Sequence, residues 1–109
     1  MTDSEFQERA EAALRAIESA VDAADADIES TRAGNVLTLE LEDGARVVIN
    51  SQAPMQQLWV AARSGAHHYA WQEGAWRDTR DGSELFSALS RIVSAEGGTA
   101  VVLADRPVR

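Results

Sequence analysis

The sequence predicts an α+β fold, namely a two-layer α/β sandwich in which two helices pack on one face of an antiparallel sheet of about five strands. One observation is that apolar residues recur at helical spacing near each end of the chain. The other is that the stretch between consists of short alternating segments separated by turn signals such as Asp43-Gly44. Two helices that flank such a meander bury their apolar stripes on the same side of the sheet, so we expect the other face to contact water.

The first predicted helix runs from Ser4 to about Asp25. Its apolar residues recur every three or four positions and therefore form one stripe. They are Phe6, Ala10, Ala13, Leu14, Ile17, Val21 and Ala24. Beside this stripe on the helical wheel lies a column of like charge, formed by Glu11, Glu18, Asp22 and Asp25.

The acidic column continues as the chain leaves this helix. We define the acidic ridge as Glu18, Asp22, Asp25, Asp27 and Glu29. No Lys or Arg lies between positions 18 and 29, and Arg15 is the one base near the column. A solvated helix face usually interleaves bases with its acids. The sequence therefore predicts a ridge whose negative charge is not compensated.

The strands of the sheet are predicted from alternation and from the turns between them. They cover residues 36–42, 45–50, the stretch from the Asn50–Pro54 turn to about Arg63, 66–72 and about 75–78. Asp43-Gly44 predicts a type I′ hairpin, and Ser64-Gly65 and Glu73-Gly74 mark two further turns.

The second helix is predicted from apolar residues at helical spacing, which are Leu85, Phe86, Leu89, Ile92 and Val93. Asp81 or Ser83 is expected to be its N-cap, and Gly97-Gly98 is expected to end it. The tail at 99–104 either pairs with a sheet edge or fills the space between the helices.

Composition excludes several classes of function. The 109 residues suffice for one domain, 1–109, and the absence of cysteine excludes disulfides and thiolate ligands. Eighteen acids against ten bases give a net charge of −8, which argues against nucleic acid and favours a basic protein surface or metal cations. The same acidity is also typical of a protein that is merely kept soluble. With no apolar run of about 20 residues and no signal-like start, we expect a cytoplasmic protein.

Catalysis is not expected. The serines lack a glycine-rich nucleophile elbow, and the glycines form no phosphate-binding loop. His67 and His68 cannot chelate one metal ion, because adjacent strand residues point to opposite faces. We place His67 inward, with Tyr69 and Trp71, and His68 on the wet face.

Trp59 is a large aromatic residue that the alternation of its strand places on the polar face of the sheet. If Leu58 and Val60 face the core, Trp59 faces water on the polar side of the sheet. One interpretation is that the ring lies flat and covers its neighbours. The other is that it anchors a partner protein, because an exposed tryptophan among polar residues is typical of a binding hot spot. The other large aromatic residues, Tyr69, Trp71, Trp76 and Phe86, are expected in the core.

The acidic ridge also allows two interpretations besides a solvated face. Its oxygen ligands suit hard cations such as Fe³⁺, Fe²⁺, Mn²⁺ or Ca²⁺. Because an open helix face cannot enclose an ion, binding there would be weak. Alternatively, the acids form a metal-independent interaction module that docks on a basic partner surface.

The residues around Trp59 resemble the frataxin family, in its bacterial CyaY-type branch. The family pattern is met by Asn50, Gln52, Pro54, Gln57-Leu58-Trp59 and Gly65. The resemblance extends to Trp76–Phe86 and to the acidic first helix, and so covers nearly the whole chain. Departures are Ser51 where lysine is common, Ala66 where a second glycine is usual, and Ser19 and Ala23 where relatives are often acidic.

The resemblance implies an iron-binding protein of iron–sulfur cluster assembly, not a classical enzyme. It would bind Fe²⁺ or Fe³⁺ weakly, modulate the complex of cysteine desulfurase and scaffold protein, and be a monomer without iron. The metal residues implied are Glu18, Asp22, Asp25, Asp27 and Glu29, and more loosely Glu11 and Glu42. The partner-binding residues implied are Asn50, Gln52, Gln57, Trp59 and His68.

Overall fold

A computed structural model describes residues 1–24, 26–97 and 101–104. The elements are α1 (Asp3–Ala23), β1 (Glu29–Ala33), β2 (Val36–Glu40), β3 (Arg46–Gln52), the 3₁₀ turn η1 (Ala53–Met55), β4 (Gln57–Ala62), β5 (Gly65–Gln72), β6 (Ala75–Asp78) and α2 (Leu85–Gly97). Within these residues the strands form one six-stranded antiparallel meander in the order β1-β2-β3-β4-β5-β6. No helix of the described residues is long and apolar enough to span a membrane.

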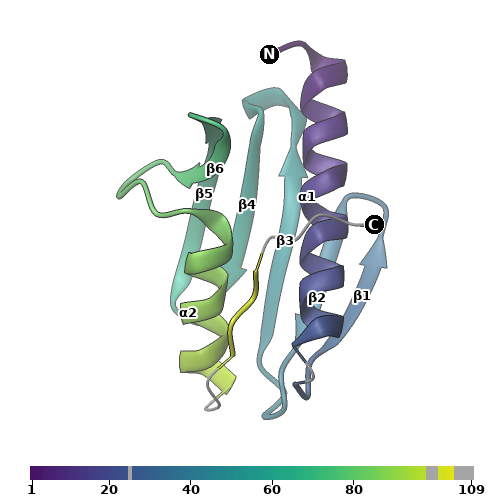
Figure 1. Cartoon of the computed structure of the whole chain (residues 1–109), viewed down its shortest axis with the longest axis vertical. Coiled ribbons are helices and arrows are strands. Elements are labelled where there is room, and N and C mark those ends of the chain that lie inside the picture. The colour runs from purple at the N-terminus through teal and green to yellow at the C-terminus, as the bar shows by residue number, and fades with distance from the viewer. Residues whose placement is uncertain (25, 98–100, 105–109) are drawn as a thin grey trace.

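Both helices cover the same face of the sheet, as predicted (Figure 1). α1 begins with a capping box in which Thr2 and Glu5 bind each other's backbone N–H groups. Its buried stripe meets inward-facing strand residues such as Leu37, Ile49 and Val60, which are fully buried. The alternate strand residues line the opposite face, which the helices leave uncovered.

β1 is the strand that alternation does not predict. Its residues, Glu-Ser-Thr-Arg-Ala, show no apolar alternation and are largely exposed. The strand is held by pairing with β2 through a two-residue turn in which Gly34 has a φ of 59°. A short, polar edge strand is typical of natural sheets, because it resists pairing with other chains. The addition of β1 is why the sheet has six strands where about five were expected.

One turn was predicted wrongly. Asp43-Gly44 does not form a two-residue type I′ hairpin, because Leu41 N–H bonds to the carbonyl of Ala45, 2.8 Å away. The loop therefore has three residues, and Gly44, with a φ of 87°, supplies its left-handed position. Glu73-Gly74 differs, since both residues have positive φ, 53° and 79°, as a type I′ turn requires.

The N-cap predicted for the second helix was also wrong. Glu84, not Asp81 or Ser83, accepts hydrogen bonds from the N–H groups of Phe86 and Ser87 at 2.8 and 3.1 Å. A longer side chain next to the helix performs the capping that sequence preferences assign to shorter ones. The helix ends at Gly97, as expected, while Gly98 lies outside the described residues.

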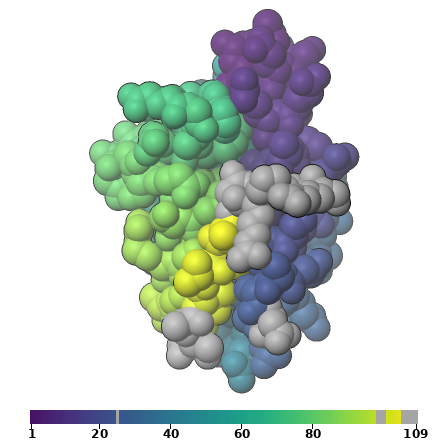
Figure 2. Space-filling model, in the orientation of Figure 1, coloured from purple at the N-terminus to yellow at the C-terminus, as the bar shows by residue number. Residues whose placement is uncertain are grey.

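The described part of the tail, 101–104, lies between the two helices and not at a sheet edge (Figure 2). The hydroxyls of Ser94 and Ser90 accept the N–H groups of Val101 and Leu103 at 2.9 and 2.8 Å. Ser94 also donates to the carbonyl of Val101. Leu103 is only 2% exposed and belongs to the core. Residues 99 and 100 of the predicted tail segment lie outside the described residues.

Candidate functional site

Two surfaces of the molecule carry the candidate site residues. One is the open face of the sheet, around Trp59. The other is the side of α1 that carries the acidic ridge, next to the edge strand β1.

The register of the strands brings all five predicted partner-binding residues together on the open face. Asn50 on β3, Trp59 on β4 and His68 on β5 are direct cross-strand neighbours. Gln52 and Gln57 are paired in the adjoining row. We call these five residues the Trp59 patch.

The Trp59 ring is held in one orientation. It stacks on the imidazole of His68, with ring centroids 4.5 Å apart and planes inclined by 16°. Its Nε1–H donates to Oε1 of Gln57 at 3.0 Å. The ring is half-buried, as expected for a side chain that lies along the sheet surface. The two interpretations of Trp59 are therefore compatible, because a ring fixed by its neighbours loses little entropy when a partner covers it.

Arg77 is a residue of this face that the sequence reasoning missed. It lies opposite Ala70, in the row of Gln52 and Gln57. Its Nε is buried and has no hydrogen-bond partner among the described residues. Alternation through β6 could have found it, since Trp76 is buried and Arg77 is the next residue. Arg77 adds a positive charge beside the Trp59 patch of an otherwise acidic protein.

The two histidines point to opposite faces, as predicted. His67 lies opposite Val60 on the helix-covered side, with Nδ1 3.8 Å from Oδ2 of the buried Asp78. Tyr69, Trp76 and Phe86 are buried, and burial raises the pKa of the Tyr69 hydroxyl to about 12. Trp71, also predicted in the core, is half-buried: it packs against the core beside Trp76, and the Arg9 guanidinium lies over its ring, 4.4 Å from the centroid.

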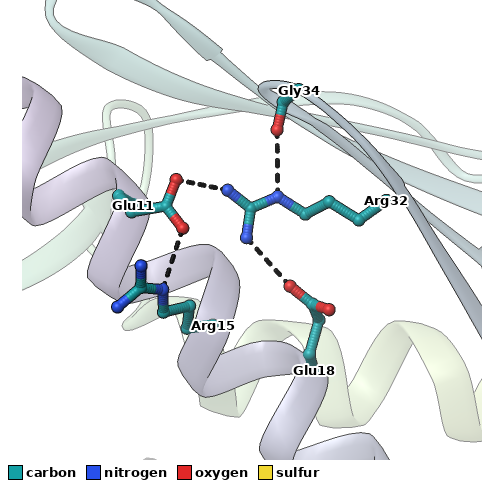
Figure 3. A network of polar contacts seen from close by, with 5 residues as sticks. All are labelled: Glu11, Arg15, Glu18, Arg32 and Gly34. Carbon is teal, nitrogen blue, oxygen red and sulfur yellow. Dashed lines mark hydrogen bonds and ion pairs between the residues drawn. The ribbon is translucent and has the colours of Figure 1, made fainter.

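The prediction that the acidic ridge is uncompensated is wrong for Glu18, which forms an ion pair with Arg32, as does Glu11 beside the ridge. Arg32 reaches from β1 to α1, where Nη1 contacts Glu18 at 2.9 Å and Nη2 contacts Glu11 (Figure 3). Its Nε donates to the carbonyl of Gly34 at 3.0 Å, and Arg15 bonds to the other oxygen of Glu11. The arrangement depends on the register, which places Arg32 opposite Leu37 and therefore on the helix side of the sheet. Because the β1 strand was not predicted, neither was its arginine.

The remaining predicted metal residues are spread over three places. Asp22 and Asp27 are exposed near the C-terminal end of α1, and Glu18 and Asp22 border a shallow hollow on that helix. Glu29 lies opposite Glu40 and so faces the open side of the sheet, and Glu42 is in the loop after β2. Asp25 lies outside the described residues. Among those described, no three His, Asp or Glu side chains are gathered closely enough to hold a metal ion.

Arg32 makes the stability of the protein depend on pH. Its hydrogen bond and charge lower the pKa of Glu11 from the ordinary value of 4.5. A carboxyl whose pKa is lower in the folded state stabilises the fold above the unfolded-state value, and this stabilisation is lost as the pH falls through the folded value. We therefore expect Tm to fall as the pH drops below about 4.5, and Glu11→Gln to flatten this part of the profile.

Melting curves from pH 6 to pH 3 check this prediction. Glu8→Gln is the matched control, since Glu8 lies one turn earlier on α1 and the variant leaves both ion pairs of Arg32 in place. An equal flattening by both variants would contradict a specific role for Glu11.

Comparison with known proteins gives a consistent result. The sequence model of the frataxin-like domain family matches residues 1–99. The chain is 52% identical over 104 residues to the iron-sulfur cluster assembly protein CyaY of Paraburkholderia phymatum, covering 95% of this chain and 99% of that protein. It is 53% identical over 107 residues to the protein of the same name from Ralstonia nicotianae, covering 94% and 95%.

Solved structures show the same architecture. The frataxin of Psychromonas ingrahamii superposes with a TM-score of 0.89 at 34% identity, covering 95% of this chain and 99% of that one. A trimeric frataxin from the yeast Saccharomyces cerevisiae, complexed with ferrous iron, has a TM-score of 0.66 at 26% identity and covers 87% of each chain.

Proposed function

Because the chain belongs to the frataxin-like family, we propose that it functions in iron–sulfur cluster assembly. It acts there in the cytoplasm as a binding protein and not as an enzyme. In the absence of iron it is a monomer. Its cargo or effector is Fe²⁺ or Fe³⁺, held weakly by carboxylates near the C-terminal end of α1. Its protein partner is the complex of cysteine desulfurase and scaffold protein. Curated relatives at about 52% identity that bear the name iron-sulfur cluster assembly protein are the observation that carries this proposal.

The exposed acids support the metal part of the proposal. Asp22 and Asp27 are free of Arg32, and Asp25, outside the described residues, lies between them along the chain. Carboxylate oxygens are ligands that hard cations accept. Since Asp22 and Asp27 are exposed and Asp22 only borders a shallow hollow, an ion bound there keeps much of its water, and binding is weak and exchangeable. Exchangeable binding is what a protein that delivers or senses iron requires.

The Trp59 patch supports the protein-binding part. An aromatic ring fixed in place among amide side chains, with Arg77 two strands away on the same face, has the composition of an interface centre. The exposed acids of α1 add long-range attraction to a basic partner surface.

The absence of a three-ligand cluster among the described residues favours a second candidate function. In it, the acids of α1 dock on a basic partner without any metal. This candidate predicts that neutralising Asp22 and Asp27 weakens partner binding equally with and without iron, and that binding falls as salt rises.

Metal binding is expected to raise the melting temperature. Mn²⁺ or anaerobic Fe²⁺ at ten times its Kd stabilises the folded state by about 1.4 kcal/mol if it binds that state alone. This corresponds to a Tm increase of roughly 6 °C for a domain of this size. The double variant Asp22→Asn/Asp27→Asn should lose the increase while keeping the ion pairs of Arg32.

Salt at the same ionic strength is the necessary control, because screening of like charges also stabilises an acidic protein. A Tm that the metal does not raise above the salt control would remove the metal part of the proposal and leave the docking candidate.

A further inference from the structure

The sequence offers the acids of α1 as one continuous surface, but the structure divides them. Glu11 and Glu18, at the edge next to β1, already hold a cation, which is the guanidinium of Arg32. Asp22 lies in the last turn of α1 and Asp27 follows the helix, and neither forms an ion pair with Arg32. Figure 3 shows the guanidinium between the two glutamates, with its third side turned to the carbonyl of Gly34.

We propose that Arg32 is a specificity-determining residue that excludes metal ions from Glu11 and Glu18 and confines them to the Asp22 end of the helix. The inference rests on the proposed function in one respect, namely that a metal cation is the ligand of these acids. It goes beyond that function by assigning an intramolecular competitor to half of the acidic column.

The geometry makes Arg32 a strong competitor. It uses both terminal nitrogens and Nε at once, on Glu18, Glu11 and the Gly34 carbonyl. Charge-assisted hydrogen bonds to carboxylates are about twice as strong as neutral ones. The side chain is 20% exposed, less than either glutamate, so it is packed in place before any ion arrives.

The covalent attachment of Arg32 to the chain also favours it over a metal ion. Arg32 is anchored on a paired strand and acts at a high effective concentration, whereas a metal ion binds from dilute solution. A metal ion that took both carboxylates would also leave a partly buried guanidinium without its ion pairs, which is costly. While Arg32 stays in place, its positive charge repels a second cation from the same oxygens.

Site-resolved Mn²⁺ titration of the ¹⁵N-labelled full chain tests the proposal. In the natural protein, paramagnetic broadening is expected around Asp22 and Asp27, with little around Glu11. In Arg32→Gln, new broadening should develop around Glu11 and Glu18, with binding there about tenfold tighter. Adding Glu18→Gln to Arg32→Gln should abolish the new site.

Two further variants separate the local effect from net charge and folding. Arg91→Gln removes the same charge from α2, where Arg91 contacts only Ser83 through a hydrogen bond among the described residues, and should change Mn²⁺ binding by less than about twofold. Arg32→Lys retains the charge but cannot bond to both glutamates with a planar guanidinium. It should therefore give a gain in Mn²⁺ binding at Glu11 and Glu18 between those of the natural protein and Arg32→Gln. It also provides a folded reference if Arg32→Gln loosens β1.

The possible outcomes distinguish the inference from the function on which it rests. If Mn²⁺ broadens nothing in the natural protein but binds Arg32→Gln at Glu11 and Glu18, the exclusion by Arg32 stands and metal binding as the natural function fails. If the natural protein is broadened around Glu11 and Glu18 as strongly as the variant, or if neither Arg32 variant gains binding there, the exclusion by Arg32 is overturned.

Discussion

Replacing Leu103 with alanine is expected to lower the free energy of unfolding by about 2–5 kcal/mol, the range measured for large-to-small substitutions in cores. Leu103 follows the second helix, yet its side chain is only 2% exposed and packs within the main core. Its N–H is bound by the Ser90 hydroxyl at 2.8 Å, which prevents the segment from sliding to refill the space. The substitution therefore leaves a cavity between the two helices.

Val102 provides a matched control from the same segment. Its side chain is 80% exposed, so Val102→Ala should change stability by no more than about 0.5 kcal/mol. Denaturant unfolding of both variants gives the comparison. Equal and small losses would mean that the tail does not belong to the core in solution.

Replacing Trp59 with alanine is expected to weaken binding to the proposed partner, the desulfurase–scaffold complex, by at least about 2 kcal/mol, a loss of about 30-fold in affinity. The ring is the largest side chain of the Trp59 patch, and it is held by His68 and Gln57 before any partner binds. Because the ring lies on the open face and not in the core, the variant should keep its fold, which a ¹H–¹⁵N spectrum checks.

Two companion variants sharpen the Trp59 result. Trp59→Phe keeps an aromatic face for His68 but loses the Nε1–H donor to Gln57, so it should lose less affinity than alanine. Met55→Ala truncates another apolar side chain, 59% exposed on the turn before β4, and should bind normally. If Trp59→Ala binds as tightly as the natural protein while Asp22→Asn/Asp27→Asn does not, the partner surface is the acidic helix.

Much of the fold was predictable because its signals are local. The stripe of α1, the alternation of β2 to β6 and the stripe of α2 depend only on spacing along the chain, and the structure confirms them. The position of Trp59 on the open face followed from the same alternation. The set of residues around it came from the resemblance to the family, and the strand register of the structure shows that they are neighbours.

The features that were predicted wrongly depend on strand pairing or on side chains that reach beyond their immediate neighbours. β1 has a polar sequence and becomes a strand only because β2 supplies hydrogen bonds along its edge. The N-cap of α2 is a glutamate that turns back onto the helix, and local preference favours shorter side chains there.

The sequence by itself determined the layers, the apolar core and the open face with its tryptophan, because periodicity is written into neighbouring residues. Tertiary structure alone decided that Glu11 and Glu18 share an arginine from the sheet. Arg32 is 14 residues from Glu18 and 21 from Glu11 along the chain, and only the β1–β2 register brings it onto the helix side of the sheet. Charge along a sequence can be counted, but compensation acts over a few ångströms in space, and the pairing of an edge strand sets those distances.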